Sequence, residues 1–282
     1  MKRKLTLHRM ALALAVVLAL SLTACSDFED LFEDTDAFSE NHEATERDSI
    51  AVDVDTTQML MLVVKSEVGT VKIQPSDDGR FVVDYKMTAY ANTDAEAQAE
   101  LAEMSVTVTP NGDRVLVDST QSVDEGDTRS DTVDLTIHVP ATIDLNVTNS
   151  VGDITVKDLT VPGTLKIAQS VGKVVLDGVA VAAPMDIHSD VGDVRFDGSL
   201  AADQAHSIST ATGEIHVALP GDASLVLDAE TTVGHIDVND FEMSSKSEEK
   251  SGAMASMQAT LGDGGATLTL RASVGDISLK QS

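Results

Sequence analysis

The heptapeptide Ser150-Val151-Gly152-Asp153-Ile154-Thr155-Val156 returns along the chain at a nearly constant spacing. Successive repeat glycines are 20, 20, 21 and 21 residues apart, and a last interval of 41 residues is about two periods. A fixed period of this size indicates a repeat architecture. The glycines of the later copies are Gly172, Gly192, Gly213, Gly234 and Gly275, and an outlying copy contains Gly69.

Each repeat contains short alternations of apolar and polar residues. The residues two and four positions after the glycine are apolar, as Ile154 and Val156 are, which is the period-2 pattern of a half-buried strand. A second alternation precedes most of the glycines, as at Leu145, and a weaker third follows a polar corner, as at Leu159. We therefore predict three short strands and three corners in each repeat.

These repeats predict an all-β fold, a single-stranded parallel β-helix or β-solenoid with rungs of about 20 residues. Successive rungs would stack ~4.8 Å apart and place like residues above like. A β-sandwich is the alternative, but its strands have no reason to repeat one motif at constant spacing. We expect the repeat solenoid over residues 141–282, with a loop insertion near 243–253 and an open β-edge at the C-terminus that favours self-association.

The N-terminal 24 residues have the pattern of a secretory signal peptide. Basic residues precede a short apolar run, residues 11–20, and the segment ends in Leu22-Thr23-Ala24-Cys25. This ending resembles the signal of bacterial lipoproteins, which implies cleavage before Cys25, lipidation of its thiol and attachment to a membrane. Ser26 resembles the outer-membrane sorting class. A secretory signal with a chance cysteine is the alternative.

An acidic, structure-poor segment follows the cysteine. We predict a disordered tether over residues 25–55, in which Phe28, Leu31 and Phe32 would share one face of a helical turn. Either this segment is a solvated spacer or these apolar residues dock on a partner.

Residues 56–140 predict an irregular N-terminal portion that covers one end of the solenoid. Strands are expected near 60–65, 68–74 and 81–90. Thr93-Asp94-Ala95-Glu96 is a capping-box signature and predicts one short helix, and residues 104–118 predict a hairpin.

The chain carries a formal net charge of −28. Its N-terminal leader is basic and contains no acid, so the chain without the leader is still more negative. Such a charge argues against nucleic acid as a partner. Cys25 is the only cysteine, so no intramolecular disulfide can form.

The V-G-D-I-x-V copies, the preceding phrase Asp134-Leu135-Thr136-Ile137-His138-Val139-Pro140 and the single early helix resemble the bacterial "putative adhesin" solenoid family over residues 56–282. That family is related to the head-domain modules of autotransporter-like surface proteins. The resemblance implies a β-helical envelope protein with a role in adhesion or scaffolding and no established catalytic set. Some members occur near components of envelope-stress signalling, which implies a second role.

The residue that follows each repeat glycine should point outward and stack on its neighbours. Most of these residues are acidic, and acidic ladders can bind cations or contact glycans. Lys173 interrupts this row, and a solvated structural ladder is the simpler interpretation. The histidines lie at different offsets of the repeat, so we expect no metal site and no cofactor. The candidate contacts for a cation or glycan are Asp153, Asp193, Glu214 and Asp276.

The sequence therefore predicts a non-enzymatic, lipid-anchored envelope protein, located at the outer membrane, whose solenoid binds a protein or a glycan. One alternative is a carbohydrate-active or glycan-binding β-helix that uses the acidic ladder, and another is an accessory of envelope-stress signalling.

Overall fold

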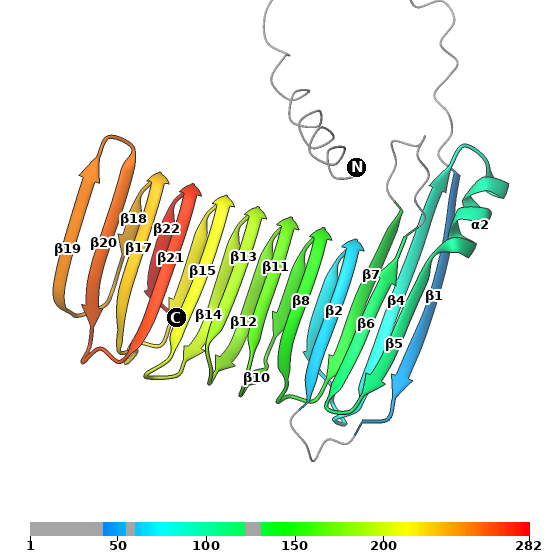
Figure 1. Ribbon diagram of the computed structural model, residues 1–282, viewed down its shortest axis with the longest axis horizontal. Coiled ribbons are helices and arrows are strands. Elements are labelled where there is room, and N and C mark those ends of the chain that lie inside the picture. Colours follow the sequence, from blue (N-terminus) through cyan, green and yellow to red (C-terminus); the bar gives the residue numbers. More distant parts are fainter. Residues whose placement is uncertain (1–41, 55–59, 122–130) are drawn as a thin grey trace, which may run out of the picture. The chain divides into compact units, whose positions relative to one another are not determined.

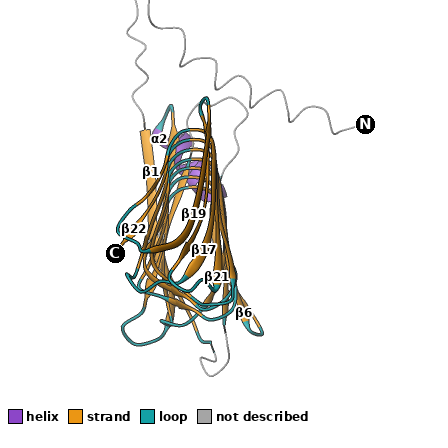
Figure 2. Cartoon of the chain, turned by 90° about the vertical axis from the view of Figure 1, so that its left-hand side faces the viewer, coloured by secondary structure: helices purple, strands orange, loops and turns teal. Residues whose placement is uncertain are grey.

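The computed structural model describes residues 42–54, 60–121 and 131–282. The described part is an all-β body of two 11-stranded sheets that lie face to face, with one helix, α2 (Asp94–Glu103) (Figures 1 and 2). None of its helices is long and apolar enough to cross a membrane. The signal peptide, Cys25 and the Phe28–Phe32 segment lie outside the described residues.

Sheet A runs in the order β1 (His42–Val52), β4 (Phe81–Ala91), β7 (Thr132–Val139), β3 (Val71–Pro75), β9 (Ile154–Lys157), β12 (Val174–Val181), β14 (Val194–Leu200), β16 (Ile215–Leu219), β22 (Ile277–Gln281) and β18 (Ile236–Val238), with β10 (Thr160–Val161) paired to β12. Sheet B runs β19 (Met243–Ser251), β20 (Met254–Leu261), β17 (Leu225–Val233), β21 (Ala266–Val274), β15 (Ala205–Thr212), β13 (Met185–Val191), β11 (Leu165–Val171), β8 (Asp144–Val151), β2 (Met61–Val68), β6 (Arg114–Thr120) and β5 (Ser105–Asn111).

The repeats form the parallel centre of this body. Leu165 pairs with Leu145 on one side and with Met185 on the other, so neighbouring strands of sheet B are offset by one sequence period. The same offset pairs Val174 with Ile154 and Val194 in sheet A. Each repeat therefore contributes one strand to each sheet, and the chain passes from sheet B to sheet A at the repeat glycine.

Two features of the predicted rung are wrong. The expected third strand is a continuation of the second, because β12 extends from Val174 to Val181 with only a bulge between Asp177 and Val179, and β10 is a two-residue remnant. The sheets are also mixed rather than wholly parallel, since antiparallel pairs occur at both ends: β1–β4, β4–β7 and β5–β6 at one end, and β17–β20 and β19–β20 at the other.

The core is a set of aliphatic columns between the two sheets. Leu145, Leu165, Ile154 and Val174 are all buried, and Phe196 is one of the largest side chains that solvent does not reach. Burying each such side chain contributes about 1.5–3 kcal/mol. His206 occupies the same column as Met185 and Leu268, and burial lowers the pKa of its imidazole.

The C-terminal strands lie inside the stack, not at its edge. β21 lies between β15 and β17, and β22 lies between β16 and β18. The predicted open C-terminal edge is therefore wrong, and self-association through it loses its basis. This insertion also explains the interval of 41 residues, because Gly234 belongs to the outermost repeat and Gly275 to the repeat inside it (Figure 1).

The interruption before the last repeat is a hairpin. Residues 243–253 were expected to be a loop, but Met243–Ser251 is strand β19, which pairs antiparallel with β20. From Ser244 onward β19 has only exposed polar residues, so it has no apolar face on which a further strand could pack. Hydrogen bonds from Lys250 and Lys246 lower the pKa of the Glu248 carboxyl. This charged edge strand discourages pairing with another chain.

The N-terminal portion is also interleaved with the repeats. β2 lies between β6 and β8 in sheet B, and β3 lies between β7 and β9 in sheet A. Residues 56–140 therefore contribute strands to the stack and also cover its end. The helix, its N-cap Thr93 and the β5–β6 hairpin are confirmed. The predicted tether is wrong over its last part, because His42–Val52 forms β1 in full register with β4.

Candidate interaction ridge

A row of valines follows the line at which the chain leaves sheet B. Each repeat valine stands directly before its glycine, and the register of sheet B places these residues above one another. Those that the structure leaves exposed are 43–48% accessible. This line joins the arrowheads of β8, β11, β13, β15, β21 and β17 in Figure 1. In stacking order the row is Val68, Val151, Val171, Val191, Thr212, Val274 and Val233.

Beside the valines, the repeat glycines form one column. Their φ angles lie between +124° and +156°, a region that other residues rarely adopt. A Cβ on any of them would lie 1.9–2.2 Å from the carbonyl oxygen of the residue below it in the column. Only glycine therefore allows consecutive turns of the chain to stack this closely.

The carbonyl groups of this glycine corner point toward buried polar side chains. Gln169 Nε2 donates to Gly152 O at 2.6 Å and to Val171 O at 2.7 Å. Asn149 Nδ2 donates to the Gly152 carbonyl at 3.1 Å and to the Gly69 carbonyl at 3.2 Å. A buried carbonyl without a donor is costly, so this polar column is part of what makes the sharp corner stable. Thr210 and Thr231 serve the carbonyls of Gly192 and Gly275 in the same way.

The predicted row of outward residues exists, and most of its carboxylates bind the backbone of the next turn. Asp153 Oδ1 accepts from the N–H of Lys173 at 2.9 Å, and Asp193 Oδ1 accepts from the N–H of Glu214 at 3.1 Å. Asp276 Oδ1 accepts from His235 N–H at 2.8 Å. These contacts join neighbouring turns of the stack, while the carboxylates remain largely exposed.

An ion pair and a histidine–carboxylate contact also lie along the row. Lys173 Nζ is 3.4 Å from Asp193 Oδ2, and His216 Nε2 is 2.9 Å from Glu214 Oε2. Within the described ranges, no three His, Cys, Asp or Glu side chains come together as metal ligands. The valine row, the glycine column and this charged row together make the surface that we call the ridge.

A pocket of about 490 Å³ closes one end of the ridge. The β19–β20 turn rises beside the last two turns of the stack, and Ala253 O accepts from Gly234 N–H at 3.2 Å. The pocket has an apolar floor of Val233, Val274 and the half-exposed Met254, and Glu214 and Asp276 also line it.

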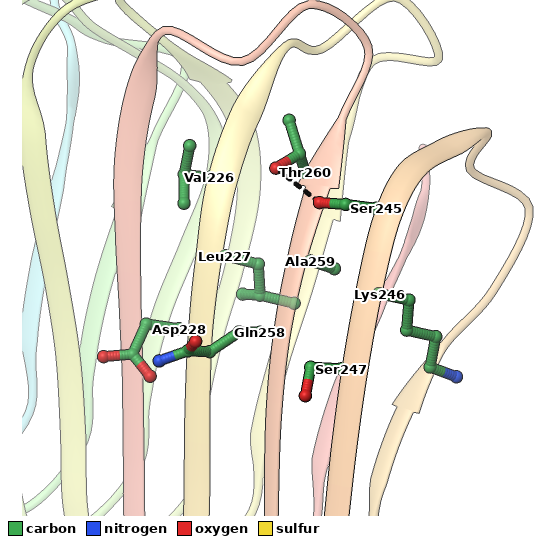
Figure 3. Close-up of a pocket in the computed structure, with 9 residues that line it drawn as sticks. All are labelled: Val226, Leu227, Asp228, Ser245, Lys246, Ser247, Gln258, Ala259 and Thr260. Atoms are coloured by element: carbon green, nitrogen blue, oxygen red, sulfur yellow. Dashed lines mark hydrogen bonds between the residues drawn. The ribbon is translucent and has the colours of Figure 1, made fainter.

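A second pocket, of about 390 Å³, lies between β17, β20 and β19 (Figure 3). Ser245 Oγ donates to Thr260 Oγ1 at 3.0 Å across it, and Lys246 and Gln258 contribute polar groups. Its acid and its base are paired with other groups, Asp228 with Arg271 and Lys246 with Glu248.

A Ser-His-Asp group does occur on the outer face of sheet B. His188 Nδ1 is 2.9 Å from Ser209 Oγ, and Nε2 is 3.0 Å from Asp190 Oδ1. Acyl transfer at such a group needs donors for the developing oxyanion. β13 and β15 pair with a strand on each side, so their backbone N–H groups are hydrogen-bonded within the sheet. The arrangement is a cross-strand hydrogen-bonded group.

The sequence reasoning placed the charged row correctly and missed the valines as a surface. The valine precedes the glycine in six of the repeat copies, and that constancy was the available signal. Valine ordinarily belongs to the interior of a strand, so this constancy alone does not indicate an exposed surface.

The fold and the ridge define a class of all-β repeat protein in which successive repeats stack to form two facing sheets. The chain belongs to the Toastrack DUF4097 family, whose model matches residues 59–206. No curated protein matches the chain.

Three solved structures are similar to the chain to different degrees. A "putative cell adhesion protein" from Clostridium sporogenes has a TM-score of 0.51 at 15% identity, over 85% of this chain and 100% of that one. A "putative adhesin" from Bacteroides fragilis has 15% identity and a TM-score of 0.36, over 84% of this chain and 97% of that one. A "putative adhesin" from Parabacteroides distasonis has 9% identity and a TM-score of 0.26, over 85% and 97%. Only the first is similar enough to support the fold.

Proposed function

We propose that this protein is a non-catalytic interaction scaffold of the bacterial cell envelope, and that the ridge is its binding surface. The main supporting observation is the valine row, because an exposed apolar row, interrupted here once by Thr212, marks a site of interaction. Parallel sheets fix the spacing of its side chains, so a partner meets a preformed surface. The name of the solved structure from Clostridium sporogenes, a "putative cell adhesion protein", agrees with a role in adhesion.

Photo-crosslinking in the native bacterium tests this function. A benzophenone amino acid replaces Val191 on the ridge or, as the control, Val226, which is 40% exposed on the outer face of sheet B. We expect a discrete crosslinked product from position 191 and none from position 226. No product at 191, or equal products at both positions, would contradict the ridge as the binding surface.

We further propose that the scaffold is anchored at the outer membrane by lipid on Cys25. The support is the sequence Leu22-Thr23-Ala24-Cys25 after an apolar run. Several acyl chains would hold the protein stably, whereas one would not. We expect wild-type protein to incorporate radioactive palmitate and the Cys25→Ala variant to incorporate none, measured by autoradiography. A labelled Cys25→Ala variant would refute the assignment.

The charged row supports a second, weaker candidate, which is contact with a cation or a glycan through Asp153, Asp193, Glu214 and Asp276. These carboxylates are exposed, although Oδ1 of each aspartate already accepts a backbone N–H. Calorimetric titration with CaCl₂ and a glycan array test it. Binding that Asp193→Asn removes would favour this candidate, and cleavage of a glycan would favour the carbohydrate-active alternative.

A further inference from the structure

We propose that the ridge receives a cationic amphipathic helix of a partner protein, laid along the direction in which the turns stack. This inference rests on the proposed function and adds the chemistry of the partner. It follows from three properties of the ridge: its charge, its spacing and the pocket at its end.

The charge of the ridge is negative, mainly on the sheet A side of the valine row. Asp153, Asp193, Glu214 and Asp276 lie on the sheet A side, opposed mainly by Lys173. Glu67 and Asp190 lie on the other side, directly before their valines. The other residues directly before the row are uncharged, so the acidic line lies chiefly on one side. An apolar line bordered by acids is complementary to a helix with one apolar stripe bordered by Lys or Arg.

The same charge argues against a second copy of this chain on the ridge. Two ridges placed face to face would bring their acidic lines together, and the chain as a whole carries a net charge of −28. Like charges placed opposite one another at an interface cost binding free energy. A basic partner removes this repulsion.

The spacing of the valines suits a helix. Valines of neighbouring turns are ~4.8 Å apart, as strands in a sheet are. An apolar heptad stripe advances ~5.3 Å for each apolar position, because 3.5 residues rise by 1.5 Å each. From Val151 to Val233 the row is about 24 Å long, which about 16 helical residues would span. Each apolar turn of the helix therefore meets about one valine.

The pocket closes one end of the ridge. Met254 stands 43% exposed on the β19–β20 turn, and the valines at the end of the row form the floor beneath it. Its volume of about 490 Å³ accommodates one large apolar side chain from the end of the helix.

The chain itself supplies a conservative way to remove the apolar row. Thr212 occupies the row between Val191 and Val274, so threonine is compatible with this position of the stack. The double variant Val171→Thr and Val191→Thr exchanges two methyl groups for hydroxyls and should keep the fold. Val226→Thr makes the same exchange on an exposed valine outside the ridge.

The test uses a labelled 21-residue peptide of Leu-Lys heptads and the purified protein, measured by fluorescence anisotropy in 150 mM NaCl. We expect saturable binding, weakened about tenfold in the double threonine variant and unchanged in Val226→Thr. Asp193→Asn should weaken binding while its amide oxygen still accepts the Glu214 N–H, and added salt should weaken binding further. A peptide with the same residues in scrambled order should bind less well.

Three results would overturn the inference: no binding of the Leu-Lys peptide, equal binding of a Leu-Glu peptide, or equal loss in Val226→Thr and the double variant. A dimer in analytical ultracentrifugation that the double variant dissociates would assign the ridge to a second copy instead. If the crosslink at position 191 persists while the Leu-Lys peptide fails to bind, the proposed function stands and the class of partner is wrong.

Discussion

Replacing Gly192 by alanine is expected to destabilise the protein by about 3 kcal/mol or more. Gly192 has a φ of +144°, and a Cβ there would lie 1.9 Å from the carbonyl oxygen of Gly172. Backbone cannot yield as a flexible side chain can, so the turns above and below must separate. Separation from the turn of Gly172 would strain the hydrogen bond from Gly172 N–H to Val191 O, which is 2.9 Å long.

Gly112→Ala is the matched control, measured by urea unfolding beside Gly192→Ala. Gly112 also has a positive φ, +64°, but nothing lies within 4 Å of the Cβ position. Its cost should be about 1–2 kcal/mol, the conformational penalty alone. Equal losses in the two variants would show that the column does not depend on close packing.

The sequence predicted the repeat itself because the repeat is local. The glycine of each copy and the apolar residues after it fix a corner and a strand, and the constant period fixes the register of neighbouring turns. The single helix was equally local, since Thr93 accepts the Glu96 N–H as the capping box requires.

The order of the turns was not predictable in this way. β22 and β18 present nearly the same pattern to β16, so local sequence does not say which of them pairs with it. The hairpin β19–β20 extends sheet B beyond β17, and β21 then returns between β15 and β17. β1 was missed because its charged residues suit an exposed edge strand as well as they suit a disordered segment.

The ridge was only half predictable. Outward direction follows from alternation, so Asp153 and Asp193 were placed correctly. Their contacts with the backbone of the next turn depend on the stacking distance, which the sequence does not state. The buried Gln169 was not recognised, because its amide is needed only where the glycine corner turns carbonyl groups inward.

Replacing Gln169 by leucine is therefore expected to destabilise the protein by about 1–2 kcal/mol, although leucine is apolar and similar in size. Gln169 is buried, and its amide nitrogen is the donor to both Gly152 O and Val171 O. Leucine removes these two hydrogen bonds, and each carbonyl keeps one other donor: Asn149 Nδ2 for Gly152 O and the Gly152 N–H for Val171 O. Gln169 Oε1 is buried without a hydrogen-bond partner, so removing this atom offsets part of the loss. Urea unfolding at neutral pH measures the change.

Gln258→Leu is the control, because Gln258 is exposed on β20 and a surface change should stay within about 0.5 kcal/mol. The fold should survive Gln169→Leu, since Ala272 occupies the same column in the repeat of β21 and cannot donate from its side chain. An unchanged or higher stability of Gln169→Leu would mean that the aliphatic contacts outweigh the two lost hydrogen bonds. The polar column would then not be what stabilises the corner.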